Sequence, residues 1–410
     1  MQDNEKKPAL RFKGFTDPWE QRKLGDVADI VGGGTPSTNN PNYWDGDIDW
    51  YAPAEIAGQI YFDSSQRKIT EQGYENSSAK MLPPGTVLFT SRAGIGKTAI
   101  LSKKGCTNQG FQSIVPHNDE LDSYFVFSRT DELKQYGELV GAGSTFVEVS
   151  GKQMAAMNLK MPTTIEEQQT IGRFFKRLDT LITLHQRKYE KLVNIKKSML
   201  NKMFPPNGAS VPEIRFKGFT DPWEQRKLDE IANFSKGVGY SKNDLCEEGT
   251  PIILYGRLYT KYETSIFDVD TFVKGKAGSV YSKGGEVIVP ASGETAEDIS
   301  IASVVVKPGI LLGGDLNIVS PTTEYDSAFL ALTISSGAAH KYLSSLAQGK
   351  SVVHLHNADI QSVSAKFPTK REQEKIHLLF GKIDTLITLH QRKLEKLQNI
   401  KKSCLEKMFV

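Results

Sequence analysis

Residues 91–98 read Ser-Arg-Ala-Gly-Ile-Gly-Lys-Thr, a composition that could bind phosphate. A glycine-rich loop that ends in Gly-Lys-Thr presents backbone N–H groups and a lysine to the phosphates of a nucleotide. That motif begins with a glycine, where this chain has Ser91, so nucleotide hydrolysis is not predicted. Two interpretations stay open: a turn between strands, or a glycine loop that brings Arg92 and Lys97 against phosphates or base edges.

His185 and His390 stand at equivalent places in two related segments and invite a metal or catalytic interpretation. Two histidines without accompanying Cys, Asp or Glu ligands make a poor metal site, whereas a polar residue in an apolar helix stripe commonly fixes register. The three cysteines, Cys106, Cys246 and Cys404, are scattered and form no Cys-x-x-Cys pair. We therefore predict neither a metal site nor a disulfide framework.

Enzyme signatures are missing from the sequence. Adenine methyltransferases carry Asp/Asn/Ser-Pro-Pro-Tyr/Phe to hold a flipped base, but the Pro-Pro pairs at 83–84 and 205–206 stand in other contexts. The carboxylates form no recognisable nuclease or glycosidase pattern. No catalytic residue is predicted.

The elements that must position these residues form two tandem copies of one frame. The sequence RFKGFTDPWEQRKL occupies residues 11–24 and recurs letter for letter at 215–228. Likewise, DTLITLHQRK occupies residues 179–188 and recurs at 384–393. The inserts between these blocks share only a faint pattern. Near-identical frames around divergent inserts indicate a common scaffold that carries two domains, each of which recognises a different target.

The repeated C-terminal blocks have the apolar periodicity of long helices. Each carries the same stripe, so we expect the two helices to pack against each other as an antiparallel coiled coil. At about 1.5 Å per residue, roughly 40 residues would extend about 60 Å. The residues assigned to the paired surface are Ile171, Phe175, Leu178, Ile182, His185 and Leu192, and then Ile376, Phe380, Ile383, Ile387, His390 and Leu397.

Charge and hydropathy narrow the class of protein. The 410 residues carry a net charge of +3, and each long helix is about five more basic than acidic, which leaves roughly −7 for the rest. The inserts therefore lack a strong positive field, and tight DNA binding would need help from partner subunits. No apolar run approaches the length of a membrane span and no signal peptide begins the chain, so a cytoplasmic protein is expected.

The inserts read as mixed α/β, with short strands and glycine-rich loops. Strand-like runs at residues 86–89 and 286–289 follow turn sequences, and residues 301–306 form another. The predicted fold class is α/β (α+β): two mixed domains separated by two long antiparallel helices, with an internal pseudo-two-fold repeat.

Taken together, these features resemble the specificity subunit of type I restriction-modification enzymes. The resemblance rests on the repeated Phe-Thr-Asp-Pro-Trp-Glu-Gln-Arg-Lys-Leu segment and on both helices, and it covers essentially the whole chain. In the first insert, residues 33–37, 90–96 and 108–109 look like the family's target-recognition domains. The counterparts in the second insert, residues 255–258 and 291–294, match less well.

The resemblance implies a subunit that performs no chemistry. Each recognition domain would read one half of a bipartite target in double-stranded DNA, and the helices would set the spacer between the halves. Two adenine methyltransferase subunits would dock on the scaffold, and restriction/translocase subunits would join them. No cofactor is expected on this chain, whereas S-adenosylmethionine, ATP and Mg²⁺ are expected on the partners.

The implied division has two recognition domains, two spacer helices and two connecting segments. These are residues 1–17, an N-terminal segment near the C-terminal helix; 18–163, recognition domain 1; 164–204, helix 1; 205–217, linker; 218–368, recognition domain 2; and 369–410, helix 2.

Polar and basic loop residues are the candidates for DNA contact, since Arg pairs with guanine and Asn or Gln with adenine. They are Thr35, Ser37, Ser91, Arg92, Gly94, Gly96, Lys97, Asn108 and Gln109 in the first domain, and Tyr255, Arg257, Tyr259, Lys261 and Ser292 in the second. Tyr43, Trp44 and Trp50 are expected to anchor the core or loops rather than to stack on bases.

Two other classes of function stay open. The weak charge of the inserts favours a protein–protein scaffold, with two heads on a coiled coil and no DNA specificity. A stand-alone enzyme would require a bound cofactor or turnover by the isolated chain.

Overall fold

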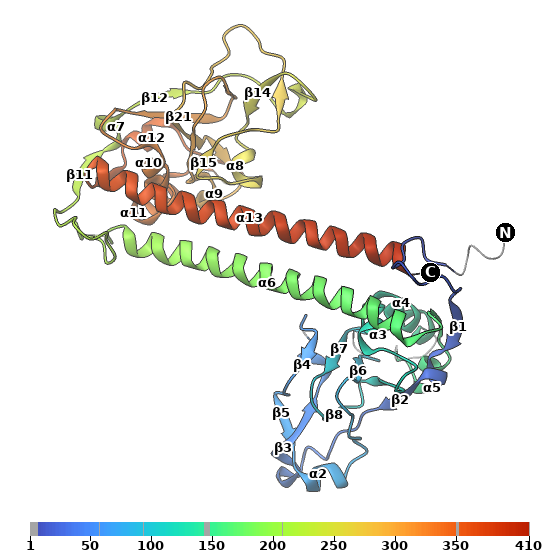
Figure 1. Ribbon diagram of the computed structural model, residues 1–410. Coiled ribbons are helices and arrows are strands. Elements are labelled where there is room, and N and C mark those ends of the chain that lie inside the picture. The colour runs from blue at the N-terminus through green and yellow to red at the C-terminus, as the bar shows by residue number, and fades with distance from the viewer. Residues whose placement is uncertain are drawn as a thin grey trace. The chain divides into compact units, whose positions relative to one another are not determined.

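The computed structural model describes residues 7–56, 58–92, 94–142, 148–206, 208–349 and 352–409. The chain forms two compact units (Figure 1). Unit 1 comprises Met1–Leu184 and Leu394–Val410, and unit 2 comprises His185–Lys393. Each unit therefore contains one insert and one part of each long helix.

The centre of unit 1 is a five-stranded sheet in the order β2-β9-β6-β7-β4. Its strands are β2 (Ala28–Gly32), β9 (Gln112–Pro116), β6 (Val87–Phe89), β7 (Thr98–Leu101) and β4 (Tyr61–Phe62). The edge strand β4 runs parallel to β7, and the other pairs are antiparallel. All residues of β6 and β7 are buried, as expected for apolar central strands covered on both faces.

Smaller elements complete the first domain. They are the three-stranded sheet β5 (Arg67–Ile69), β3 (Trp44–Tyr51) and β8 (Cys106–Thr107), with helices α2 (Glu71–Glu75), α3 (Ser123–Ser128), α4 (Thr130–Gly141) and α5 (Gly151–Ala155).

Unit 2 repeats the five-stranded sheet with a different sequence. The order is β12 (Ala232–Lys236), β21 (Leu316–Pro321), β17 (Glu286–Pro290), β19 (Ser303–Val305) and β15 (Ser265–Ile266). The edge strand β15 is again parallel to its neighbour, and the other pairs are antiparallel. The divergent inserts thus share one sheet topology.

The remaining elements of the second domain are short. They are the strands β13 (Leu245–Cys246), β16 (Phe272–Val273), β14 (Thr250–Ile253) and β20 (Leu311–Leu312), the pair β18 (Ser292–Gly293) and β22 (Val353–His354), and the helices α8 (Arg257–Thr260), α9 (Ala296–Ile299), α10 (Ser327–Ile334), α11 (Gly337–Leu346) and α12 (Asn357–Gln361).

Each insert begins and ends in a two-stranded antiparallel ribbon. In unit 1 the ribbon joins β1 (Glu20–Lys23) to β10 (Asn158–Met161), and in unit 2 it joins β11 (Glu224–Lys227) to β23 (Ser364–Phe367). A one-turn helix follows the first strand of each, α1 (Leu24–Val27) and α7 (Leu228–Ile231). The ribbon brings the two ends of the insert together on the frame.

The long helices are α6 (Ile165–Met203) and α13 (Lys370–Met408), each of 39 residues. The two helices contact each other in both units and run in opposite directions. An early residue of each, Asp179 of α6 or Asp384 of α13, pairs with a late residue of the other, Lys401 in unit 1 or Lys196 in unit 2. The predicted fold class, two mixed α/β domains with paired long helices, is confirmed.

Each domain core includes the end of the helix that belongs to the other repeat. In unit 1, the ring of Phe409, which follows α13, stacks on Phe175 of α6 at 5.7 Å between ring centres. In unit 2, Phe204, which follows α6, stacks on Phe329 at 5.4 Å and lies edge-to-face with Trp223. Neither insert therefore closes its core with its own repeat alone.

The segment before each insert also binds both long helices. Arg11 donates two hydrogen bonds to the buried Glu167 carboxylate, both at 2.7 Å, and the Leu10 N–H donates to the Lys407 carbonyl at 2.8 Å. In unit 2, Arg215 and Glu372 form the same double hydrogen bond at 2.8 Å. Leu10 and Arg11 thus occupy, at the end of α13, the place that Ile214 and Arg215 of the linker occupy at the end of α6.

Replacing Phe204 by Ala should destabilise unit 2 rather than the domain of its own repeat. Loss of a buried phenyl ring costs about 3–5 kcal/mol, so hydrogen-exchange protection should fall across residues 228–367 and stay unchanged across 24–161. Phe409→Ala should give the reciprocal pattern, with a smaller effect because this ring is partly exposed. Leu184→Ala, at an exposed helix position, is the control. A loss of protection confined to residues 24–161 in Phe204→Ala would contradict the cross-packed cores.

Candidate nucleic-acid interface

Three loops of the first domain meet beside the five-stranded sheet. Residues 33–37 follow β2, residues 91–97 connect β6 to β7, and residues 107–110 lead into β9. The Gly34 N–H donates to the Thr107 carbonyl at 2.8 Å, which ties the first loop to the third. The structure therefore gathers the predicted contact residues of this insert into one cluster of loops.

Two further contacts close this cluster. The Ser91 N–H donates to the Gly110 carbonyl at 2.8 Å, and the Thr35 hydroxyl contacts the Gln109 side chain. Gly33 must be a glycine here, because a Cβ at this position would lie 2.0 Å from the Asn108 carbonyl oxygen. Any larger residue would push the first and third loops apart.

Two tryptophans of β3 anchor the backbone of the first loop, as expected from the sequence. The Trp50 indole N–H donates to the Gly34 carbonyl at 2.8 Å, and the Trp44 indole N–H donates to the Ser37 carbonyl at 3.2 Å. The two rings lie edge-to-face with centres 5.1 Å apart. Both indole N–H groups are bonded to the loop backbone and both rings are buried, so the two tryptophans act as anchors and not as stacking platforms.

The predicted residues of the first domain differ in how accessible they are. Those exposed to solvent are Ser37, Arg92, Gly94, Lys97 and Gln109; those partly exposed are Thr35 and Asn108; and those buried are Ser91 and Gly96. The Ser91 hydroxyl is enclosed by protein, so its side chain does not reach the loop surface. Arg92 forms a 2.9 Å ion pair with Glu148, but both side chains remain open to solvent. Exposed pairs of this kind are weak and exchange readily.

The second domain builds the same loop junction from residues 291–294, which the sequence indicated, and from two loops that the sequence reasoning missed. The Val238 N–H donates to the Leu312 carbonyl and the Ala291 N–H to the Asp315 carbonyl, which repeats the pattern of the first domain. A Cβ at Gly237 would lie 1.9 Å from a backbone oxygen, as at Gly33. Residues 237–241 stand 204 positions after 33–37, the same offset as the repeated frame, and this offset could have identified them.

Three predicted residues of the second domain are engaged inside the protein. Arg257 is only 8% exposed and forms ion pairs with Glu263 at 2.8 Å and Asp270 at 2.7 Å. The Tyr259 hydroxyl donates to the Ser292 carbonyl at 2.6 Å. The Arg257 and Tyr259 side chains are therefore already bonded within the protein, and Ser292 is buried.

Tyr255 and Lys261 are the predicted residues of this domain that reach solvent. The Lys261 ammonium lies 2.9 Å from Asp270 and, together with Arg257, lowers the pKa of that carboxyl to about 2. Asp270 therefore stays ionised and partly neutralises the basic groups around it. This arrangement keeps the local field weak, in line with the charge balance of the inserts.

His185 and His390 face each other within the helix pair of unit 2. Their Nδ1 atoms are 2.7 Å apart, so one must donate and the other accept. Burial, His390 and the nearby Lys393 and Lys188 lower the pKa of His185 below its ordinary value. No group of three or more His, Cys, Asp or Glu side chains that could hold a metal ion occurs among the described residues.

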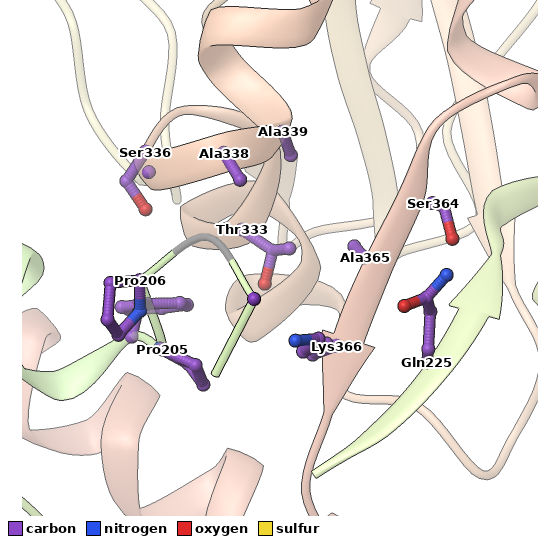
Figure 2. Close-up of a pocket in the computed structure, with 13 residues that line it drawn as sticks. Pro205, Pro206, Gln225, Thr333, Ser336, Ala338, Ala339, Ser364, Ala365 and Lys366 are labelled. Carbon is purple, nitrogen blue, oxygen red and sulfur yellow. The ribbon is translucent and has the colours of Figure 1, made fainter. Parts of the chain in front are cut away.

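A pocket of about 320 Å³ lies near the end of α6 in unit 2 (Figure 2). Pro205 and Pro206 face the start of α11 across it, and Lys366 and Gln225 come from the ribbon β11–β23. The Lys366 ammonium donates to the Ala209 carbonyl, so it is occupied. The described lining contains no Asp, Glu, His or Cys that could act as acid, base or metal ligand.

Comparison with known proteins shows which family this chain belongs to. A family model described as the type I restriction modification DNA specificity domain matches residues 16–194 and, a second time, residues 220–399. The chain belongs to this family. It is a DNA specificity subunit with two target-recognition domains, and the family is non-catalytic.

Specificity subunits of known systems match over most or half of the chain. The chain is 26% identical over 408 residues to the type I restriction enzyme MjaIX specificity subunit of Methanocaldococcus jannaschii, covering 95% of this chain and 92% of that protein. It is 28% identical over 200 residues to the EcoR124I/EcoR124II specificity subunit of Escherichia coli, covering 44% and 48%.

A solved structure shares the fold. The crystal structure of the type I restriction-modification S subunit from M. genitalium aligns with a TM-score of 0.67 at 13% identity, over 98% of this chain and 99% of that one. In the described part of this specificity subunit, no helix is long and apolar enough to cross a membrane.

The histidine pair should make the helix pair less stable in acid. Folding lowers the pKa of His185, so the neutral histidine contributes to the stability of the folded chain. This contribution is fully present above the unfolded pKa of about 6.5 and is lost as the pH falls through the pKa of the folded state. Between pH 7.5 and 5.5 the Tm of the wild-type chain should fall by more than that of His185→Leu/His390→Leu. His356→Leu, at an exposed site, should behave like wild type. Equal acid sensitivity in the double variant would refute this role.

Proposed function

We propose that this chain directs a type I restriction-modification complex to a bipartite, gapped target in double-stranded DNA. Recognition domain 1, residues 18–163, reads one half and recognition domain 2, residues 218–368, reads the other. The observation that carries the proposal is that two inserts of different sequence share one sheet topology and one loop junction on near-identical frames. A common fold with divergent loops suits two readers of different sequences.

In the first domain, we assign base and phosphate contacts to side chains of the loop junction that are exposed or partly exposed to solvent. These are Thr35, Ser37, Arg92, Lys97, Asn108 and Gln109. The amides of Asn108 and Gln109 suit adenine, and the basic side chains suit guanine or phosphate. In the second domain, we assign the same task to exposed residues of the matching loop, Ser241 and Lys242, and to Tyr255 and Lys261.

The paired helices, residues 164–204 and 369–410, set the spacer between the half-sites. A helix of 39 residues extends about 58 Å, which exceeds the roughly 34 Å between half-sites one helical turn apart. The described parts of the connecting segments, residues 7–17 and 205–217 without 207, close each end of the frame. The antiparallel repeat suits readout of opposite strands.

Two methyltransferase subunits dock on the identical surfaces of the frame. Leu181 and Leu184 of α6 and the matching Leu386 and Leu389 of α13 are 42–44% exposed, although all four are large apolar residues. Apolar side chains that stay exposed at matching places in both repeats favour two copies of one partner. S-adenosylmethionine, ATP and Mg²⁺ belong to these and to the restriction/translocase subunits, and the complex acts on DNA in the cytoplasm.

Mapping N6-methyladenine across a genome tests the proposal. Cells that contain the chain and its methyltransferase subunit should methylate a gapped two-part motif that is absent without the chain. Gln109→Ala should relax one base of one half-site, at a cost of about 1–3 kcal/mol in discrimination, and leave the other half intact.

The control is Gln72→Ala, which removes an exposed glutamine of α2 outside the loop junction. Methylation that does not depend on the chain, despite a purified complex with the methyltransferase, would reject the proposal in favour of a protein–protein scaffold.

A further inference from the structure

Two aspartates at matching positions of the repeated helices form three-way junctions. In unit 1, the Lys401 ammonium of α13 lies 2.6 Å from Asp179 Oδ1 of α6. In unit 2, the Lys196 ammonium of α6 lies 2.6 Å from Asp384 Oδ1 of α13. One oxygen of each aspartate thus ties the two helices together.

The other oxygen of each aspartate accepts a hydrogen bond from the recognition domain. The Tyr124 hydroxyl of α3 donates to Asp179 Oδ2 at 2.9 Å. The Thr264 hydroxyl, just before β15, donates to Asp384 Oδ2 at 2.8 Å. Each aspartate therefore joins its own helix, the opposite helix and the insert.

The two hydroxyls come from positions that do not correspond. In the first domain, Ile60 stands at the position of Thr264. The Ile60 carbonyl accepts a hydrogen bond from the Ile100 N–H of β7, just as the Thr264 carbonyl accepts one from the Val304 N–H of β19. The place of Tyr124 is taken in the second domain by Ala328, two residues after the Asp that caps the helix. Different residues of divergent inserts thus supply the same contact, which suggests that the contact itself is required.

These hydroxyls are well placed to act as fixed points. Tyr124, Asp179 and Thr264 are each buried. Burial, followed by the charge of Asp179, raises the pKa of Tyr124, so its hydroxyl keeps the proton that it donates. A buried hydrogen bond to a carboxylate is stronger than a neutral one and has a defined direction.

A second fixed point matters because of how each insert is attached. Its two ends leave the frame together through one two-stranded ribbon, β1–β10 or β11–β23, while its core packs on the ends of both long helices, so the freedom that remains is a small tilt about the ribbon. The hydroxyl–aspartate bond lies far along the chain from that ribbon. A lysine of α6 also lies over an aromatic ring nearby, Lys176 at 5.1 Å from Tyr61 in unit 1 and Lys196 at 5.6 Å from Tyr262 in unit 2.

We propose that Tyr124 and Thr264 are positioning residues that fix the angle of each recognition domain on the paired helices, and thereby the spacer length that the complex accepts. The inference rests on the proposed function. Neither residue reads bases. Without the hydroxyl the domain can tilt about its ribbon, so half-sites at other spacings become acceptable while half-site sequence preference stays the same.

The test measures methylation by the complex with methyltransferase subunits on DNAs whose spacer is one base pair shorter than, equal to or one longer than the natural one. Tyr124→Phe and Thr264→Val should each raise the ratio of methylation at altered to natural spacing by roughly fivefold, as expected for loss of one hydrogen bond. The half-sites should be unchanged.

Matched controls remove hydroxyls that bond only within a domain. Tyr136→Phe loses a bond to the Gln153 carbonyl, and Thr271→Val loses one to the Ile252 carbonyl. Both should keep the wild-type spacer profile. If Tyr124→Phe fails to assemble, Thr264→Val carries the same test in unit 2.

An unchanged spacer profile in the variants, or equal broadening in the controls, overturns the inference. A changed half-site also overturns it, because the residue would then be a reader. If the wild-type complex methylates no gapped target, the proposed function fails first. If the wild type does so and the variants keep its profile, only the positioning role fails.

Discussion

The burial of aromatic rings contributed by both long helices is the interaction on which the rest of this protein depends. Phe175 stacks on Phe409 in one unit, and Phe204 stacks on Phe329 in the other. Each ring that follows a long helix completes the core of the opposite repeat. Because removing such rings costs several kcal/mol, neither domain is independent of the helix pair. A reader of DNA that needs a fixed spacer benefits from this dependence.

The division between frame and insert explains how one chain can hold two specificities. Matching ribbons, ion pairs such as Arg11–Glu167 and Arg215–Glu372, and matched helices hold both inserts, and each insert supplies one hydroxyl for a frame aspartate. Loop chemistry is then free to differ. The acidic balance outside the helices leaves the inserts without a strong positive field.

Sequence reasoning predicted the parts governed by periodicity and repetition. Ile171, Phe175, Ile376 and Phe380, which the apolar stripe assigned to the paired surface, are buried, and they pack within the cores of the two domains. The loop residues were harder to predict. Nothing in the sequence shows that Arg257 is held by Asp270, thirteen positions later, because that pairing depends on how β16 and its loop fold back. The hydroxyl contacts of Tyr124 and Thr264 come from unmatched positions, so alignment of the repeats does not reveal them.

A circular permutant tests the central claim, that the frame is a closed repeat in which each end segment serves the opposite helix. The old termini would be joined by a short Gly-Ser linker and new ones opened between Pro206 and Gly208. If residues 7–17 and the linker are equivalent, the permutant should fold and direct methylation to the same two half-sites with the same spacer. A permutant that unfolds, or that reads the same half-sites at a different spacer, would contradict the account.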